Sequence, residues 1–358
     1  MIALRNMIAF LVAAVLCVDV GVFAHPGEDI ELVNHEAAIH KATLKVAHAA
    51  ISRCDDAPAA LALKKNAIFR RYGLADALQY ENSLGRTDDF LDERDEKDLK
   101  KWEALSHDDT SKDWNAGTPE SVIFGSNATT ALTPESILGP YFVSGELFRK
   151  DITEGQDGVP LHLDLQFVNQ NTYEPIPDML VDIWHSNATG VYSGIAQGAG
   201  QAGLNTTFLR GVAKTDTEGV VQFDTIYPGH YGGRSNHIHI LTIEGGIMLP
   251  NKTYTGGRAN HVGQLYFNQA LNDAVENFAP YNSNKQQYTT NQNDGFAKDA
   301  ASAQYDPFMS YIRLGSGPGD GLLAYITVGV NQDANYDAKP AAHWGHDGGH
   351  ECHNDNCN

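Results

Sequence analysis

The sequence predicts a mainly β fold in which a β-sandwich follows an N-terminal helical segment. Two observations predict it. After about residue 134, short apolar stretches recur between turns of Gly, Pro and Asn, which is typical of a sandwich with mostly antiparallel strands. Before residue 74, apolar residues recur every three or four positions, which indicates helices. With 358 residues, of which 42% are hydrophobic, the chain is long enough to bury a substantial core.

Residues 1–24 are predicted to be a signal peptide. An apolar run follows a positive charge, and Val22 and Ala24 stand at the positions that signal peptidase reads, so the mature chain would begin at His25. A retained membrane anchor is the alternative, but Asp19 interrupts the apolar run and no other segment is apolar enough to cross a membrane. We therefore expect a secreted, extracellular protein with no membrane association.

Glycosylation sequons fit this route. Each Asn-X-Ser/Thr motif is weak evidence alone, but together they favour a glycoprotein made in a eukaryotic secretory pathway. The acceptor positions are Asn127, Asn187, Asn205 and Asn251.

The chain is acidic, with a formal net charge of −20. Removing the signal peptide does not change this value, because Arg5 and Asp19 cancel. Such a charge repels phosphate backbones and anionic lipids, so neither nucleic acid nor a membrane surface is an expected partner.

Three cysteines remain once Cys17 is removed with the signal peptide. Cys352 and Cys357 could close a small loop and leave Cys54 unpaired, or Cys54 could link the N-terminal region to the tail. Both pairings stay open, and neither builds the fold.

The helical region and a charged linker are expected over residues 25–133. The apolar pattern predicts a helix pair or a kinked helix that ends at Gly73. Residues 88–112 are dense in charge and predict a solvated helix or linker. Packing against the sandwich is the expected role of the helices, with a dimerisation or lid element as the alternative.

The sandwich is expected over residues 134–330, and a tail that contains His and Cys over residues 331–358. Residues 280–306 are polar and rich in Asn and Gln, so we expect a long surface excursion. The predicted strands cover residues 161–168, 180–185, 220–226, 237–243 and 322–330.

Two histidines predict a metal site. If residues 237–243 form a strand, His237 and His239 lie on the same face, because side chains two apart in a strand share a side. Tyr231 lies six residues upstream in a turn, and Tyr192 follows an earlier strand. Two phenolates and two imidazoles form a hard, anionic ligand set that suits Fe(III) better than the sets preferred by zinc, copper or calcium.

Five segments follow one another between residues 134 and 270. In this order they resemble the signatures of the intradiol ring-cleavage dioxygenases, the family of catechol 1,2-dioxygenase and protocatechuate 3,4-dioxygenase. The segments are GPYF (139–142), VDIWHSNATGVYS (181–193), GVVQFDTIYPGHYG (219–232), RSNHIHI (234–240) and GQLYF (263–267).

The resemblance implies a non-haem Fe(III) enzyme that uses O2 to open a catechol-type ring between its two hydroxyl-bearing carbons, giving a muconate-type diacid. It implies Tyr192, Tyr231, His237 and His239 as iron ligands, with Tyr231 the one that leaves when the substrate chelates. Two further residues are implied beside the substrate, where Arg234 would stabilise charge on the ring and Gln264 would line the pocket. A homodimer is a family expectation.

The sequence also departs from the family. The spacing from Tyr231 to His237 is short, and the stretch between His239 and Gln264 is long. Both differences fall where the mouth of the pocket is expected, so the ring substituents of the substrate cannot be carried over.

Other functions remain open. The sandwich could be a non-catalytic module that binds iron or catechols, or a protein that sequesters iron or a catechol siderophore. A copper site at His25 lacks an identifiable second histidine. A further cluster, expected to bind metal adventitiously, contains His343, His346, His350, Cys352 and His353.

Overall fold

A computed structural model shows the fold. The structure describes residues 43, 46–82, 99–112, 114–115, 118–119, 122, 138–196, 200–301, 305–352 and 357. The predicted signal peptide, His25 and the sequon at Asn127 lie outside these residues.

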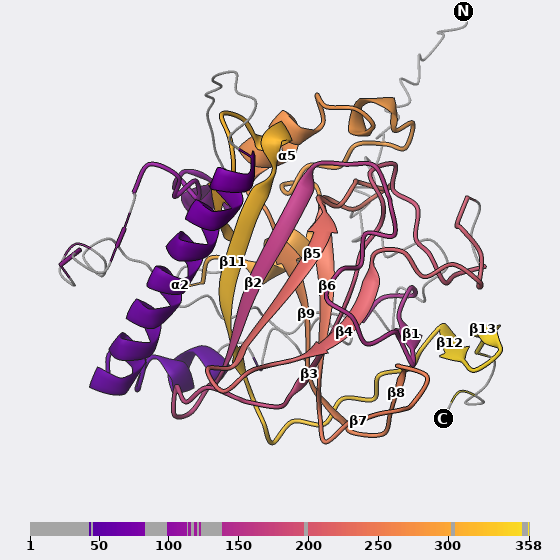
Figure 1. The fold of residues 1–358 in the computed structure, drawn as a ribbon, viewed down its shortest axis with the longest axis horizontal. Helices are drawn as coiled ribbons and strands as arrows, with labels where there is room; N and C mark the ends of the chain where they lie inside the picture. The colour runs from indigo at the N-terminus through magenta and orange to yellow at the C-terminus, as the bar shows by residue number, and fades with distance from the viewer. Residues whose placement is uncertain are drawn as a thin grey trace, which may run out of the picture.

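Two four-stranded sheets form the body of the molecule (Figure 1). In the first, the order is β10 (Ser310–Arg313), β11 (Leu322–Val330), β2 (Pro160–Asn169) and β5 (Val220–Ile226). In the second, the order is β4 (Arg210–Lys214), β3 (Leu180–Trp184), β6 (His237–Glu244) and β9 (Arg258–Tyr266). Pairs within these sheets are antiparallel except β11 and β2, which run parallel. The predicted sandwich and its predicted strands are confirmed.

The sheets enclose one apolar core. Leu163 and Leu165 of β2 belong to the same buried cluster as Ile238 and Ile240 of β6. Burying each such side chain contributes about 1.5–3 kcal/mol relative to leaving it exposed. Because side chains alternate across a strand, the other residues of β6 face away from this core, onto the outer side of the second sheet.

Helix α2 (Pro58–Asn82) covers the outer face of the first sheet (Figure 1). A turn at residues 52–57 separates it from the helical residues 46–51, so the predicted helix pair is confirmed. The predicted end at Gly73 was wrong. Tyr72 and Ala75 pack on Ile312 and Leu323 of the sheet, and this burial outweighs the cost of about 1 kcal/mol for a glycine within a helix.

The same helix explains why β2 is not half-exposed as its alternation predicted. Asp164 and Gln166 are buried because α2 covers them. Arg70 donates two hydrogen bonds to the Asp164 carboxylate, at 3.0 and 2.9 Å, and Arg71 donates one at 2.9 Å. Burial alone would raise the pKa of Asp164, but these guanidiniums hold it to about 2.

We expect Asp164→Asn to lower the free energy of unfolding at neutral pH by about 3 kcal/mol, because breaking a buried ion pair leaves charges without a partner. The folded-state pKa is depressed, so the carboxylate stabilises the protein above its ordinary pKa near 3.8 and loses this effect as the pH falls toward about 2. Denaturant unfolding should therefore depend less on pH between about 4 and 2 in the variant. The matched control is Asp337→Asn, which removes an exposed carboxylate near Lys339. Equal stability of Asp164→Asn and wild type would contradict this account.

The described part of the charged segment packs onto the domain, so the prediction of a solvated linker was wrong there. Helix α3 (Leu99–Glu103) buries Trp102 in a cluster with Tyr266 and Phe308. Further along, the Tyr325 hydroxyl donates to the Asp109 carboxylate. A few buried apolar side chains thus hold this segment in place. They are too sparse to give a periodic pattern in the sequence.

The prediction of a surface excursion over residues 280–306 was correct only in part, since residues 282–287 are exposed or half-buried but several later residues are buried. After α5 (Gln269–Val275), the chain forms the 3-10 turn η1 (Tyr281–Ser283) and helix α6 (Gly295–Ala300). Asp294 is fully buried and its carboxylate caps α6 by accepting from the backbone N–H groups of Phe296 and Ala297. Thr289, Asn291 and Asp294 are buried, so part of the polar composition here serves buried hydrogen bonds rather than solvent.

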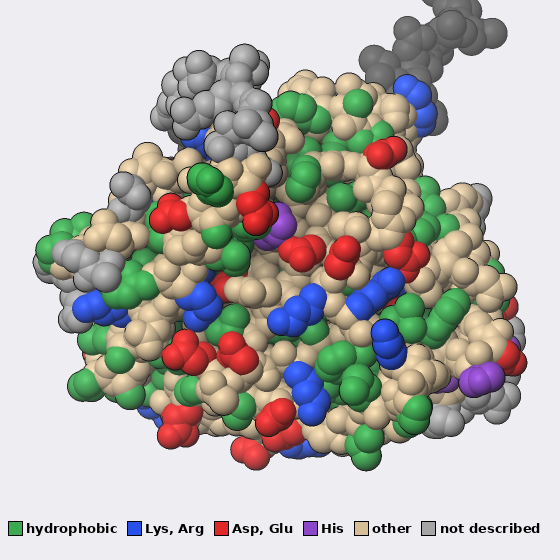
Figure 2. All heavy atoms as spheres, viewed as in Figure 1, with side chains coloured by type: hydrophobic (Ala, Val, Ile, Leu, Met, Phe, Trp, Pro, Cys, Tyr) green, Lys and Arg blue, Asp and Glu red, His purple; other side chains and the backbone are tan. Residues whose placement is uncertain are grey.

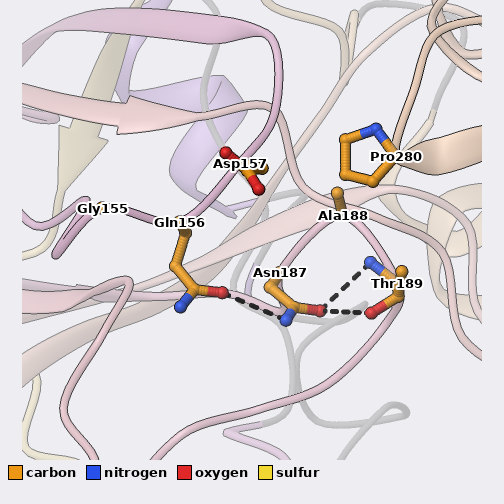
Figure 3. Close-up of a pocket in the computed structure, with 7 residues that line it drawn as sticks. All are labelled: Gly155, Gln156, Asp157, Asn187, Ala188, Thr189 and Pro280. Atoms are coloured by element: carbon orange, nitrogen blue, oxygen red, sulfur yellow. Dashed lines mark hydrogen bonds between the residues drawn. The ribbon is translucent and has the colours of Figure 1, made fainter.

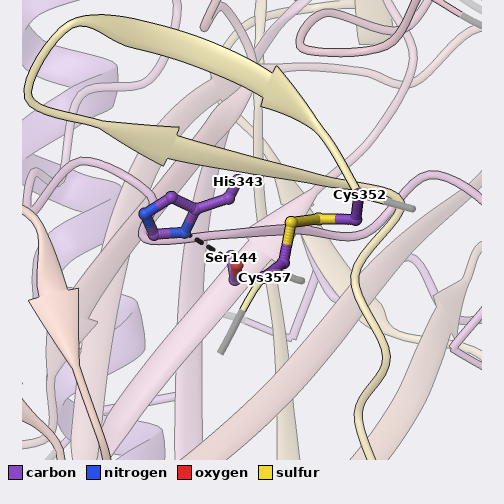
Figure 4. The surroundings of a disulfide bond; sticks show 4 residues. All are labelled: Ser144, His343, Cys352 and Cys357. Carbon is purple, nitrogen blue, oxygen red and sulfur yellow. Dashed lines mark hydrogen bonds between the residues drawn. A yellow bond between two sulfur atoms is a disulfide. The ribbon is translucent and has the colours of Figure 1, made fainter. Parts of the chain in front are cut away.

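The tail forms the hairpin β12 (Ala342–Gly345) and β13 (Gly348–Glu351), and β12 pairs in parallel with β1 (Val143–Ser144). A disulfide joins Cys352 and Cys357, and Cys54 is unpaired, which is the first of the two expected pairings (Figure 4). Two short elements complete the described fold: the pair β7 (Ile247–Met248) and β8 (Tyr254–Thr255), and the 3-10 turn η2 (Pro318–Asp320).

Acidic and basic side chains are interspersed on the face shown in Figure 2, and no basic stripe runs across the described residues seen there. None of the helices within the described ranges is both long enough and apolar enough to cross a membrane.

Candidate metal centre

His237 and His239 lie on the outer face of the second sheet, both buried, as the strand pattern predicts. Their Nε2 atoms are 3.1 Å apart. Two ligands at right angles around one ion, each about 2.1 Å from it, would stand about 3.0 Å apart. The two imidazoles are therefore spaced as adjacent ligands of a single metal ion.

Contacts with neighbouring residues orient both imidazole rings. His237 Nδ1 donates a hydrogen bond to the Ser235 carbonyl at 2.6 Å, which leaves the Nε2 lone pair directed toward the proposed centre. Trp184 of β3, the register partner of His239, stacks on the His239 ring at 4.9 Å with an interplanar angle of 5°. Such contacts hold an imidazole ready for metal binding before the ion arrives.

Tyr192 and Tyr231 come from two turns that pack on each other beside β6. Gly229 makes this approach possible, because a Cβ there would lie 2.4 Å from the Asn187 carbonyl oxygen and 2.5 Å from that of Ala188. The rings of the two tyrosines meet edge to face with centroids 5.5 Å apart. The structure thus brings all four predicted ligands together.

Tyr231 Oη lies 3.3 Å from His237 Nε2. The hydroxyl of Tyr192 has no well-aligned hydrogen-bond partner among the described residues, although its side chain is fully buried. An unsatisfied buried hydroxyl is costly, and a metal bond would satisfy it.

Burial raises the pKa values of Tyr192 and Tyr231 above the ordinary value near 10. The charge of Arg234 opposes this rise at both phenols. Two phenolates could form in this apolar environment only beside a compensating cation, and a trivalent ion provides that charge.

The donor set fits Fe(III). Two phenols and two imidazoles converge, and in the described residues no group of three or more His, Cys, Asp or Glu side chains is placed to hold a metal ion. The latter finding covers the described histidines of the tail, where His343 contacts Ser144 and His350 contacts Asp347. Hard oxygen and nitrogen donors favour Fe(III) over softer ions.

Arg234 is buried at the other side of the centre. Its Nε donates to Asp294 at 3.0 Å, and its Nη2 donates to the Gln264 side-chain oxygen and to the Tyr266 hydroxyl. The guanidinium also lies over the Phe296 ring at 4.6 Å. Burial alone would lower the pKa of Arg234, but the negative charge of Asp294 raises it, so the side chain stays cationic.

Gln264 is the register partner of His239 on β9, which brings it to the same face. Its side-chain oxygen also accepts a hydrogen bond from the Tyr266 hydroxyl at 2.6 Å. The predicted pair Arg234 and Gln264 is therefore a single hydrogen-bonded unit, fixed by Asp294 from a loop 60 residues downstream.

Several residues of this centre were not predicted as site residues. Tyr141 packs on both phenols, with centroids 4.6 Å from Tyr192 and 6.2 Å from Tyr231. Tyr266 could have been predicted, because it stands two residues after Gln264 on the same strand and so shares its face. Asp294 stands in a polar loop and gave none.

His230, the third histidine near the predicted ligands, points elsewhere. Its Nδ1 lies 2.8 Å from a Glu276 carboxylate oxygen, and its Nε2 lies 3.2 Å from the Gln286 carbonyl. Both ring nitrogens are therefore occupied by packing contacts of the loop.

A polar pocket lies beside the turn that leads to Tyr192 (Figure 3). Asn187 lines it, and its side-chain oxygen accepts from the backbone N–H groups of Thr189 and Val191, while its Nδ2 donates to Gln156. This asparagine shapes the turn, so we expect its sequon to be incidental rather than glycosylated.

Comparison with known proteins shows which proteins this chain is similar to. Residues 137–246 match the Dioxygenase_C family, described as dioxygenase. Catechol 1,2-dioxygenase 1 of Acinetobacter lwoffii is 31% identical over 105 residues, which is 28% of this chain and 32% of that enzyme. The chain thus matches about a third of the length of this curated relative.

Solved structures extend the match. An intradiol ring-cleavage dioxygenase from Tetranychus urticae is 26% identical, with a TM-score of 0.49, covering 58% of this chain and 98% of that one. A further dioxygenase crystal structure is 27% identical, with a TM-score of 0.50, covering 59% and 98%. The matched region and the curated relative therefore make the chain similar to the intradiol ring-cleavage dioxygenases.

Proposed function

We propose that this protein is an extracellular non-haem Fe(III) dioxygenase that cleaves catechol-type rings between the two hydroxyl-bearing carbons with O2, giving muconate-type diacids. The observation that carries the proposal is the convergence of two buried phenols and two buried imidazoles at one point. The name of the curated relative, catechol 1,2-dioxygenase 1, supports the substrate class.

In this proposal Tyr192, Tyr231, His237 and His239 hold the iron. When bound, Fe(III) would provide a Lewis acid that the two catechol oxygens chelate, which would make the ring reactive toward O2. Tyr231 would be the ligand that the catechol displaces, and its Oη would then accept one catechol proton. Tyr141 packs on Tyr192 and Trp184 packs on His239, so these two aromatic residues exclude water from the ligand side chains.

Arg234 acts on the organic substrate rather than on the metal. Its buried guanidinium is held by Asp294, Gln264 and Tyr266 before substrate arrives. A fixed cation of this kind stabilises negative charge as it develops on the ring, without having to reorganise during the reaction.

Oxygen uptake tests the proposal. Iron-replete protein should consume one O2 per catechol and form a ring-opened diacid that carries both atoms of labelled O2. The panel should include substituted catechols and hydroxyquinol, because the pocket mouth departs from the family. A protein that binds catechol at iron but consumes no O2 with any member of the panel would instead be a non-catalytic binding module.

Secretion is proposed from the predicted signal peptide and from the exposed sequons at Asn205 and Asn251. Expression in a eukaryotic secretory host should release a chain that begins at His25 and loses mass on glycosidase treatment. Retention of the whole product inside the cells would contradict this part of the proposal.

A further inference from the structure

Arg210 is a buried cation next to the proposed ligand Tyr192 that the proposed reaction does not use. It is 1% exposed and stands on β4, on the same outer face of the second sheet as the histidines. The register pairs Arg210 with Trp184, Trp184 with His239, and His239 with Gln264. These four side chains form a row across the sheet, with Arg210 at one end and Gln264 at the other. Gln264 in turn accepts a hydrogen bond from Arg234.

The contacts of Arg210 centre on the turn that carries Tyr192. Its Nε and Nη2 donate to the Ser193 carbonyl at 3.0 and 2.7 Å, and its Nε also approaches the Ser193 hydroxyl at 3.1 Å. The guanidinium carbon lies 5.9 Å from the centroid of the Tyr192 ring. One side chain thus fixes the residue that follows Tyr192 and places a positive charge beside its ring.

Among the described residues, one carboxyl group lies within ion-pair distance of this cation. Arg210 Nη1 lies 3.5 Å from Glu146 Oε1, a long contact for an ion pair that is 1% exposed on both sides. A second carboxyl group near Glu146 belongs to Asp182, which accepts a hydrogen bond from the Tyr254 hydroxyl at 3.0 Å. The second oxygen of Glu146 and that of Asp182 have no hydrogen-bond partner among the described residues.

Burial raises the pKa of Glu146 to about 7, and burial followed by the charge of Glu146 raises that of Asp182. Two buried carboxyls with one guanidinium do not both ionise readily. Arg210 therefore has at most a partial counter-charge on the side away from Tyr192.

We propose that Arg210 is a positioning residue for Tyr192. It holds the turn through the Ser193 carbonyl, and its positive charge stabilises Tyr192 as a phenolate. The negative charge of Glu146 offsets part of this electrostatic effect. The inference rests on the proposed function, because it takes Tyr192 as an iron ligand. It predicts opposite effects for the loss of Arg210 and the loss of Glu146.

The tyrosinate-to-iron charge-transfer band measures this directly, because it moves an electron from the phenolate to Fe(III). At a pH above the raised pKa of Glu146, where the wild type carries the counter-charge, Glu146→Gln leaves the cation uncompensated, stabilises the phenolate and should shift the band to higher energy. Arg210→Met combined with Glu146→Gln removes the pair and should shift it to lower energy. A unit charge about 6 Å from the ring, at an effective dielectric constant near 20, changes the energy of an electron on the ring by about 1,000 cm⁻¹. The band shift is the part of this change that differs between the ring and the iron, so it should be on the order of hundreds of cm⁻¹.

Two further variants keep the test decisive. Arg210→Lys retains the charge but loses the forked contact with Ser193, so it should change the band energy less than the loss of charge does. Glu218→Gln removes an exposed carboxylate that lies near Arg70 of helix α2, away from the proposed centre, and should leave the band energy unchanged. The single variant Glu146→Gln decides the sign even if removal of Arg210 prevents folding.

Shifts of the same sign in Glu146→Gln and the double variant, or no shift in Glu146→Gln when the wild type shows the band, would overturn this role of Arg210 and leave the proposed function intact. Absence of the band from the iron-replete wild type would overturn both.

Discussion

His239→Ala should lower iron affinity at least about 100-fold. Loss of the partners that merely orient a metal ligand costs 10–100-fold in affinity, so loss of the ligand itself should cost more. His239 Nε2 lies 3.1 Å from His237 Nε2, and Trp184 stacks on its ring, which fixes it at the centre. Titration of metal-free protein with iron, with bound metal quantified, measures the change.

The matched control is His162→Ala. His162 also lies on a strand, but on the first sheet, where its Nδ1 is 2.6 Å from an Asp224 oxygen. This variant should bind iron as the wild type does. If His239→Ala kept wild-type affinity, or if both variants lost it equally, the centre would not be where we place it.

Arg234→Ala should lower kcat/KM by about 10²–10³-fold and leave bound iron unchanged. Removing one preorganised contact to developing charge has this effect on rate, and Arg234 is not a proposed metal ligand. Steady-state oxygen uptake and iron quantification on the same preparation separate the two quantities. Loss of iron together with rate would show that Arg234 only holds the centre together.

Two variants separate charge from geometry at this position. Arg234→Lys keeps a cation but cannot reach Asp294, Gln264 and Tyr266 together, so we expect most of the rate to be lost. Arg234→Ala combined with Asp294→Asn avoids an unpaired buried carboxylate, so it should recover stability relative to Arg234→Ala without recovering rate. Recovery of rate in the double variant would contradict an electrostatic role for Arg234.

Sequence alone predicted the parts of the fold that depend on local alternation. The strands β2, β5, β6 and β11 lie where their patterns indicate, because one side of each faces the apolar core. The cover of α2 over Asp164 was not predictable, since a buried salt bridge between residues 94 apart leaves no periodic signal. Tertiary packing likewise carried α2 past Gly73.

The same distinction holds at the centre. His237 and His239 could be placed on one face from strand geometry, and motif order pointed to the tyrosines and Arg234. Other groups reach the centre through sheet register or long loops. The pairing of β3 with β4 and β6 brings Trp184 and Arg210 to it, and the loop after α5 brings Asp294. Single residues in such positions carry no sequence pattern of their own.

The visible spectrum of the purified protein, with iron quantified, before and after anaerobic addition of catechol, tests the central claim most directly. With two tyrosinates on Fe(III), the protein should show a charge-transfer band that shifts when catechol binds, with one iron per chain. A colourless protein that takes up no iron on reconstitution would contradict the claim.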